Sequence, residues 1–276
     1  MKPSFFINQH DRSNFPSLHE LISLSGKRAL ITGAASGIGK AIALRFAEAG
    51  ADLILVDIDA ATLARTAEEV AGLGTEVAIH RVDLALEDEI AALWDNLEGQ
   101  EPDILVNNAG IYPFRHFVDA DEEFVHQVMA INYYSISRMC RQMIRRRGKR
   151  GGVIINLGSI EAVQPFKEDL AHYSVSKASV IALTRALARE YAGHGFRVNA
   201  ILPGGIITPG TKAVARQVLN FKFDLLKTGY EFSQRLPAGR AGQPDEVARM
   251  ALVLASDLGS YVHGAAIPID GGFLAA

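Results

Sequence analysis

The sequence predicts an α/β protein with a doubly wound parallel sheet of about seven strands and helices on both faces. Short apolar segments of four to six residues recur along the chain, as expected for strands that are buried on both sides. Segments with helical periodicity separate them, and a glycine cluster joins the first strand to the first helix. Right-handed crossovers between such strands give a doubly wound sheet.

Strands and helices alternate in order from residue 27. The first apolar segment, 28–32, ends at a glycine, and the helix that follows, 38–49, is ended by Gly50. Pro268 in the last strand suits the edge of a sheet. The other expected strands are 53–56, 77–82, 103–106, 152–156, 197–201 and 265–269, and the other expected helices are 60–72, 87–97, 124–147, 173–192 and 245–254.

Because the alternation continues without a break, we expect a single domain over residues 27–276. Residues 1–26 resemble an N-terminal arm whose role the sequence does not indicate. Residues 209–236 contain no strand pattern, and we expect helical pieces there that form a lid over the site.

Composition excludes several classes of protein. Of 276 residues, 49% are apolar and 21% are charged, which is typical of a folded globular chain and not of a disordered one. The net charge of −3 provides no basic field for nucleic acid. Cys140 is the only cysteine, which excludes an intrachain disulfide and a cysteine-rich zinc site. No apolar stretch approaches a membrane span, and the first residues lack a signal-peptide pattern, so we expect a cytoplasmic protein.

The segment 32–39 has the residues of a phosphate-binding turn. Gly33 allows a sharp turn after the strand, while Gly37 and Gly39 let the backbone approach a pyrophosphate and let the helix pack closely. The N–H groups at the start of the helix, around Ser36 and Ile38, then face the phosphates. The sequence therefore predicts a dinucleotide site of the Rossmann type, the alternative being a tight turn without a ligand.

Asp57 ends the second strand, 18 residues after Gly39. A carboxylate there accepts hydrogen bonds from the adenine ribose and repels a 2′-phosphate, and Ile58 follows instead of a cation. We therefore expect NAD rather than NADP. The alternative is an aspartate that only caps the next helix.

Three residues form a candidate acid–base group. Tyr173 and Lys177 are four apart on an expected helix and share one face, and Ser159 follows the fifth strand at the edge where ligands bind. A nearby ammonium favours the phenolate and lowers the pKa of a tyrosine, which can then exchange a proton with an alcohol or a carbonyl. Ser159 would hold the substrate oxygen.

Taken together, these patterns resemble the short-chain dehydrogenase/reductase family, in its branch of about 250 residues. The resemblance extends from Lys27 to Gly272. It rests on the segment 32–39, Asp83 after the third strand, the segment 107–110 after the fourth, Asn132, Ser159, Tyr173 with Lys177, Pro203-Gly204 with Thr208, and the terminal segment 270–272.

The resemblance implies further roles. Tyr173 would be the acid–base group, Lys177 would also bind the nicotinamide ribose, and Asn132 would complete a proton relay. It also implies a homotetramer or a homodimer. The implied cofactor contacts, beyond the turn and Asp57 with Ile58, are Asp83 and Leu84 at the adenine, Asn107, Ala109 and Gly110 along the groove, and Pro203, Gly204, Ile206 and Thr208 at the nicotinamide.

Substrate contacts are expected close to Ser159. Glu161 and Gln164 are polar and would bind hydroxyls of a sugar or polyol, although Glu161 is equally compatible with a solvated or ion-paired role. His116, Tyr112 and Tyr261 are further candidates. Ser159 precedes Tyr173 by 14 residues, one more than is common in the family, and we expect the extra residue in a surface loop over 161–169. We interpret His172 as structural and the basic residues of 138–150 as a solvated helix end.

The sequence thus predicts an NAD-dependent oxidoreductase that interconverts a secondary alcohol and a ketone by hydride transfer. A sugar, polyol or related hydroxy compound is the expected substrate, without a metal and without a nucleic-acid or membrane partner. Two alternatives remain open at this point: a 3-oxoacyl thioester reductase, and a non-catalytic NAD-binding scaffold with the same fold.

Overall fold

A computed structural model describes residues 15–211 and 235–276 of the chain. Seven parallel strands form one sheet in the order β3-β2-β1-β4-β5-β6-β7, which confirms the predicted fold class. The strands are β1 (Arg28–Thr32), β2 (Asp52–Asp57), β3 (Val77–Arg81), β4 (Ile104–Asn107), β5 (Gly152–Leu157), β6 (Phe196–Pro203) and β7 (Ala266–Ile269). Pro268 lies on β7, at an edge of the sheet, as its missing N–H requires.

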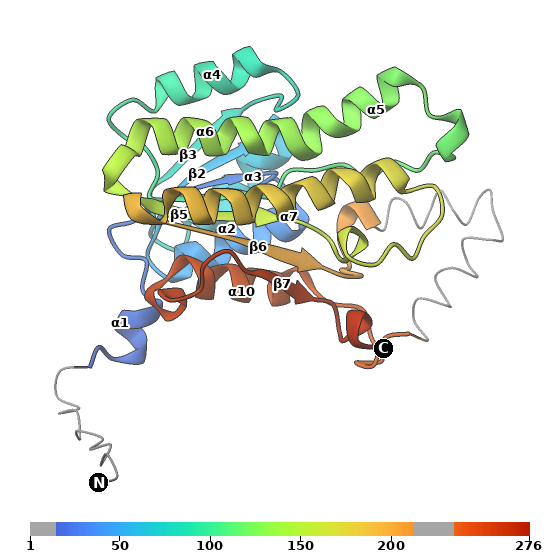
Figure 1. Cartoon of the computed structure of the whole chain (residues 1–276). Coiled ribbons are helices and arrows are strands. Elements are labelled where there is room, and N and C mark those ends of the chain that lie inside the picture. The colour runs from blue at the N-terminus through green and yellow to red at the C-terminus, as the bar shows by residue number, and fades with distance from the viewer. Residues whose placement is uncertain (1–14, 212–234) are drawn as a thin grey trace, which may run out of the picture.

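Helices cover both faces of the sheet (Figure 1). One layer contains α2 (Gly37–Glu48), α3 (Ala60–Ala71) and α10 (Pro244–Ala255), and the other contains α4 (Glu87–Asn96), α6 (Ser135–Arg147) and α7 (Ala171–Tyr191). Each layer closes its own apolar core, the first around Phe46 and Leu55 and the second around Trp94 and Ile154. The central strands are therefore buried on both sides, which is why they are almost continuously apolar.

The order of the sheet positions the site. Strands β2 and β3 extend the sheet on one side of β1, and β4 to β7 extend it on the other side. The carboxyl ends of β1 and β4, where the side switches, open a crevice. The glycine turn, the segment after β4 and the segment after β5 all leave the sheet at this edge. Residues from three distant parts of the sequence therefore meet there.

The helix expected at 124–147 is interrupted. It consists of α5 (Glu122–Met129) and α6, joined by a π-helical turn over Ala130–Tyr134 that contains Asn132. A π-turn closes with i→i+5 hydrogen bonds, and apolar periodicity alone does not reveal it. Such turns are frequent at functional sites.

The described part of the N-terminal segment contains a short helix, α1 (Leu18–Ile22). Ser17 and Glu20 form a reciprocal capping box at its start. Residues 1–14 of the expected arm and residues 212–234 of the expected lid lie outside the described residues.

The basic residues of 138–150 are not a solvated helix end alone. Arg138 pairs with Glu87 and Arg146 with Asp95, both on α4, while Arg147 pairs with Asp103 just before β4. Much of the cluster thus attaches α6 to its acidic neighbours.

Within the described residues, no helix combines the length and apolar character needed to cross a membrane.

Candidate active site

The glycine turn between β1 and α2 is shaped so that only glycine fits. Gly33 and Gly37 have φ angles of +65° and +57°, and a Cβ on Gly39 would lie 2.1 Å from the Gly33 carbonyl oxygen. The Asn108 amide supports the turn from the neighbouring strand by donating to the carbonyls of Thr32 (3.0 Å) and Gly33 (3.1 Å). The support by Asn108 joins residues about 75 apart in sequence, and spacing gave no sign of it.

The turn fits a dinucleotide. Ser36 is the N-cap of α2, yet its side chain makes no capping hydrogen bond, so the first N–H groups of the helix are left for a ligand. Thr208, beyond β6, lies against the turn, because a Cβ on Gly37 would be 3.4 Å from the Thr208 Cβ. Ile206 is buried nearby. These residues would hold the pyrophosphate and the nicotinamide half of NAD or NADP.

Asp57 stands at the end of β2, half-buried, beside the glycine turn. Its carboxylate accepts hydrogen bonds from Ala35 N (2.9 Å) and Asp59 N (3.0 Å). The cap of α3 is Asp59, which accepts from Thr62 N. The alternative in which Asp57 only caps the next helix is therefore wrong, and its carboxylate is fixed where an adenine ribose would lie.

The residues predicted to contact the cofactor at the ends of β3 and β4 have different surroundings. Leu84 is buried, and the Asp83 carboxylate accepts from Ala85 N and so shapes the turn. The Asn107 side chain faces the interior, where its amide donates to Asn156 (2.8 Å) and Cys140. Asn107 is the last residue of β4, and its side chain is buried between β4 and β5 and does not line the groove as expected.

Small residues surround the lysine. A Cβ on Gly110 would lie 3.3 Å from Lys177 Nζ and 3.2 Å from Asn132 Oδ1, so these three residues meet.

The segment after β6 packs closely on the C-terminal segment, because a Cβ on Gly204 would lie 2.8 Å from the Asp270 Cα. Asp270 accepts from the N–H groups of Gly272 and Leu274. The terminal glycine-rich segment thus supports the segment that follows β6.

Ser159, Tyr173 and Lys177 converge as predicted. Ser159 follows β5, and its hydroxyl lies close enough to Tyr173 to lower the pKa of the phenol. Lys177 is almost fully buried, lies with Nζ 6.0 Å from the centre of the Tyr173 ring, and donates to the Leu157 carbonyl (2.8 Å). The serine and the tyrosine can therefore hold one substrate oxygen between them.

The electrostatic environment of the pair differs from the simple expectation. Burial raises the pKa of Tyr173 to about 12, opposed by its hydrogen bond from Ser159, and burial lowers the pKa of Lys177 to about 8. The protein environment alone therefore does not hold the phenol at a low pKa. While protonated, Lys177 still favours the phenolate, because an opposite charge nearby stabilises the ionised form.

Asn132 is fully buried in the π-turn. Its Oδ1 accepts from Ile111 N (2.8 Å), and its Nδ2 donates to the Ile111 carbonyl (2.8 Å) and to Ser176 Oγ (3.1 Å). The side chain thus fixes the segment after β4 to α7, one residue before Lys177. Asn132 therefore positions the lysine and the groove, which spacing alone did not indicate.

Glu161 is buried in the short turn after Ser159. One carboxylate oxygen accepts from Phe166 N (3.3 Å) and lies 3.4 Å from Ser174 Oγ, and the other has no hydrogen-bond partner within the described part of the chain. Burial raises the pKa of Glu161 to about 7. The sequence left open a solvated or an ion-paired role for Glu161, and its burial excludes the solvated one. Phe166, on the same loop, packs on buried Phe273 with ring centres 4.8 Å apart.

The other substrate candidates lie at different depths. Tyr112 is edge-on to Tyr173, with ring centres 6.1 Å apart. Gln164 is half-buried, and His116 stands at the rim, paired with Asp169 (2.8 Å). Tyr261 is fully exposed. It precedes β7, so it lies at the amino ends of the parallel strands, away from the crevice, and its choice as a substrate contact is wrong. His172 stacks on Phe117, which agrees with a structural role.

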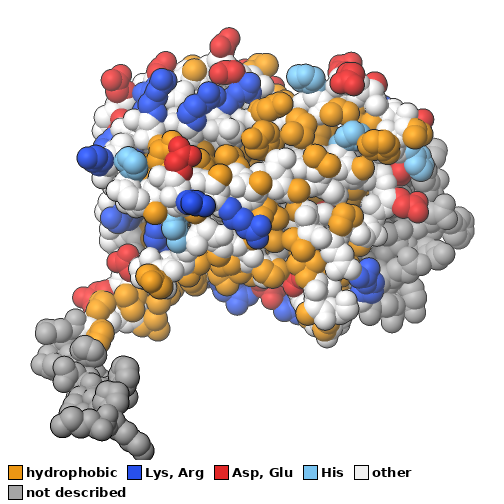
Figure 2. Space-filling model, in the orientation of Figure 1, with side chains coloured by type: hydrophobic (Ala, Val, Ile, Leu, Met, Phe, Trp, Pro, Cys, Tyr) orange, Lys and Arg blue, Asp and Glu red, His pale blue; other side chains and the backbone are white. Residues whose placement is uncertain are grey.

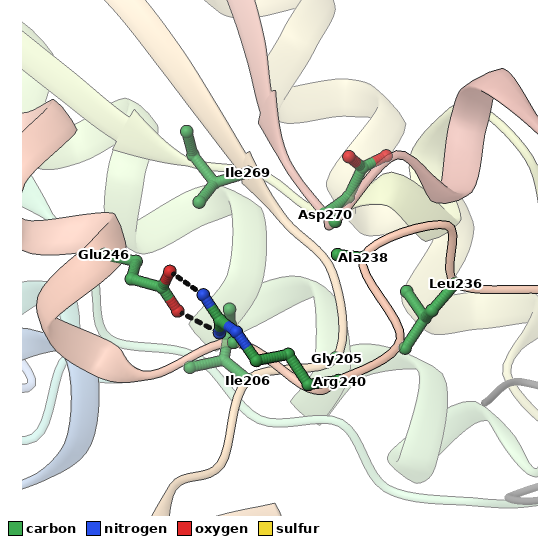
Figure 3. A pocket seen from close by; sticks show the side chains of 10 residues that line it. Gly205, Ile206, Leu236, Ala238, Arg240, Glu246, Ile269 and Asp270 are labelled. Atoms are coloured by element: carbon green, nitrogen blue, oxygen red, sulfur yellow. Dashed lines mark hydrogen bonds and ion pairs between the residues drawn. The ribbon is translucent and has the colours of Figure 1, made fainter.

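A pocket of about 60 Å³ lies beyond the ends of β6 and β7 (Figure 3). Ile206, Leu236 and Asp270 contribute to its walls, and Arg240 spans it to form a two-pronged ion pair with Glu246 (2.7 and 2.9 Å). None of Ser159, Tyr173 and Lys177 lines it. It is therefore separate from the acid–base group.

Gly39→Ala is expected to abolish dinucleotide binding and to destabilise the fold by several kcal/mol, because its Cβ would overlap the Gly33 carbonyl. Gly193→Ala is the matched control, since its Cβ would meet nothing within 4 Å and its φ is not positive. Thermal unfolding and NADH fluorescence titration of both variants measure the two effects. Equal behaviour of the two variants would contradict this account of the turn.

Glu161 is expected to make the stability of the protein depend on pH. Its folded pKa, about 7, lies above the ordinary value, so the folded state binds more protons than the unfolded state between about pH 4.5 and pH 7. Stability therefore falls as pH rises through this window, by at most about 3.5 kcal/mol at 1.4 kcal/mol per pKa unit. Glu161→Gln should remove this loss, so the difference in Tm between variant and wild type grows from pH 5 to pH 8. A constant difference would refute the prediction.

Comparison with known proteins gives matches over nearly the whole chain. The family model described as enoyl-(acyl carrier protein) reductase matches residues 33–274. A galactitol 2-dehydrogenase (L-tagatose-forming) from Cereibacter sphaeroides is 40% identical over 254 residues, 91% of this chain and 96% of that protein. A 3-oxoacyl-(acyl-carrier-protein) reductase from Thermotoga maritima is 37% identical over 254 residues, 91% of this chain and 99% of that protein.

Solved structures agree with these matches. A short-chain type dehydrogenase/reductase from Mycobacterium marinum is 34% identical, with a TM-score of 0.86, and the match covers 94% of this chain and 100% of that one. A gluconate 5-dehydrogenase from Burkholderia cenocepacia, in complex with NADP and tartrate, is 29% identical, with a TM-score of 0.85 and the same two coverages.

Proposed function

Because this chain belongs to the short-chain dehydrogenase/reductase family, and is thus an NAD(P)-dependent oxidoreductase acting on CH–OH groups, we propose that it uses NAD to oxidise a sugar, polyol or related hydroxy compound. The observation that carries the proposal is the convergence of Ser159, Tyr173 and Lys177 at the crevice, beside a buried Glu161. The similarity to a galactitol 2-dehydrogenase supports the substrate class.

The residues have distinct roles in the proposed reaction. Ser159 Oγ and Tyr173 Oη hold the substrate oxygen, and Tyr173 takes the hydroxyl proton during oxidation or returns it during reduction. Lys177 stabilises the phenolate by its charge, and Asn132 keeps the lysine and the segment after β4 in register. When bound, the nicotinamide ring supplies the hydride acceptor or donor.

NAD is the proposed cofactor because of Asp57. Its carboxylate, fixed by Ala35 N and Asp59 N, would bind the two ribose hydroxyls and repel a 2′-phosphate. The Burkholderia cenocepacia relative was solved with NADP, so the proposed preference of this chain for NAD rests on the Asp57 side chain.

We also propose a homotetramer or homodimer in the cytoplasm. Apolar side chains cover much of the face formed by α5, α6 and α7 (Figure 2), and Phe117, Tyr134 and Val175 are among the exposed ones. Exposed apolar surface of this extent commonly marks an interface. Light scattering of the purified chain measures the state directly, and a monomer would refute the proposal.

A 3-oxoacyl thioester reductase is the second candidate, favoured by the similarity to the Thermotoga maritima protein. The catalytic residues serve both reactions, so the substrate distinguishes them. The test is a panel of galactitol, other polyols, sugars, hydroxy acids and steroids with NAD, against an acetoacetyl thioester with NADH and NADPH. Faster turnover of the thioester would refute the polyol proposal, and binding of NAD without any turnover would favour a scaffold.

A further inference from the structure

Two buried polar atoms beside the catalytic tyrosine have no hydrogen-bond partner among residues 15–211 and 235–276. They are one carboxylate oxygen of Glu161 and the hydroxyl of Tyr112. A buried polar group without a partner costs about 1–3 kcal/mol, so a folded protein rarely retains one without a reason. Two such atoms beside the residue that exchanges the proton indicate a ligand that satisfies both.

Both residues lie close to Tyr173. The Glu161 N–H donates to Ser159 Oγ (3.2 Å), which fixes the turn beside the position of the reacting oxygen. Tyr112 meets Tyr173 edge-on, and its hydroxyl lies 4.0 Å from where a Cβ on Gly210 would stand, on the side of the segment after β6. Glu161 and Tyr112 therefore border the space next to the reacting carbon.

The charges around this space select the kind of group that enters it. Glu161 is a buried acid, and the charge of Lys167 acts on it, but the Lys167 ammonium lies over the Phe114 ring, 4.0 Å from its centre. His116 and Asp169 pair with each other at the rim. Above about pH 7, where Glu161 is ionised, a neutral hydroxyl can donate to Glu161 and bond with Tyr112, whereas a carboxylate in the same place is repelled by Glu161.

We propose that Glu161 and Tyr112 form a subsite for a neutral hydroxyl on the carbon next to the one oxidised, so that the enzyme selects a vicinal diol over a simple alcohol and over a 2-hydroxy acid. This inference rests on the proposed oxidation of a CH–OH group. It narrows the substrate class to neutral polyols and sugars. It assigns the discrimination to two residues outside the acid–base group.

Three small alcohols test the subsite, because they share the reacting carbon and differ only at its neighbour. These are propan-2-ol, propane-1,2-diol and lactate, each oxidised at carbon 2 with NAD. Wild type should use the diol with a kcat/KM at least about tenfold above that of either other compound, as expected when a site built for a hydroxyl meets an analogue without one. Equal values for the diol and propan-2-ol would overturn the proposal.

Three variants locate the selectivity. Tyr112→Phe and Glu161→Ala should each lower the ratio of diol to propan-2-ol several-fold. Glu161→Gln keeps the shape and removes the charge, so it should raise the ratio of lactate to diol about tenfold, a change that a merely structural role would not produce. Glu168→Gln is the matched control, because it makes the same change of charge on an exposed residue of the same loop and should leave both ratios at the wild-type values.

Binding provides a second readout if the small alcohols turn over too slowly. Ligand-observed NMR on the Tyr173→Phe variant loaded with NAD compares the three compounds without reaction. The same order of preference supports the subsite, and equal binding overturns it. The two proposals fail differently: an enzyme that oxidises no polyol in the panel refutes the proposed function, whereas an enzyme that oxidises polyols but shows ratios unaffected by Glu161→Gln and Tyr112→Phe refutes the subsite alone.

Discussion

Replacing Tyr173 with phenylalanine lowers kcat for NAD(P)-linked alcohol oxidation by about 1000-fold or more. The variant loses the Tyr173 hydroxyl, which lies beside Ser159 and near the Lys177 charge, and positioned acid–base groups contribute about 100- to 10,000-fold. Cofactor binding should change little, because the phenylalanine ring keeps the shape of the site. The measurement is the initial rate of NADH formation together with a fluorescence titration of NADH.

Tyr191→Phe is the control for that experiment. Tyr191 ends the same helix, and its hydroxyl is hydrogen-bonded to Glu190, far from the crevice. The same atom is removed in both variants, so a common loss of stability cannot explain a selective loss of turnover. Comparable rates in the two variants would mean that another group moves the proton.

Replacing Asp57 with asparagine weakens NAD binding by about 10- to 150-fold, the range expected for loss of a charged hydrogen-bonding partner worth roughly 1.5–3 kcal/mol. NADP binding should tighten at the same time, because the repulsion of a 2′-phosphate disappears. Adding Ile58→Arg should shift the preference further, since Ile58 is exposed next to the same position. Calorimetric titration with both cofactors measures the ratio.

Asp52→Asn is the matched control for the cofactor prediction. Asp52 begins the same strand, at the opposite edge of the sheet, and its carboxylate accepts from Glu76 N. The overall charge changes equally in both variants, so a difference between them isolates the local effect of Asp57. Tighter binding of NADP than of NAD by the wild type would refute the assignment outright.

The sequence predicted the parts of the site that depend on element order. Ser159 follows a strand, Tyr173 and Lys177 share a helix face, and Asp57 ends the strand next to the glycine turn. Parallel topology brings all of these to one edge, so the order of strands and helices was sufficient. The bounds of the strands agreed closely for the same reason, since each is a short apolar segment between helices.

The contacts that depend on side-chain direction were not predictable in this way. Asn107 and Asn108 are adjacent, but one faces the interior and the other supports the glycine turn. Whether Glu161 is buried or solvated depends on how the loop after Ser159 folds over Phe273, more than 100 residues away. Tyr261 was misplaced because residues near the C-terminus can lie at either edge of the sheet.

The wide turn that carries Asn132 has a consequence for how the chain tolerates insertion and deletion. A turn closed by i→i+5 bonds uses one residue more than an α-helical turn, so it adds a residue without rotating the helix that follows. The segment Ala130–Tyr134 therefore has the form of a single-residue insertion within a longer helix. Removing Ile131 would leave Met139 and Met143 facing the core while displacing the amide that bonds to Ile111. With the extra residue of this turn, the helix supports the sheet and also places Asn132 at the crevice. Without that residue, the helix would only support the sheet.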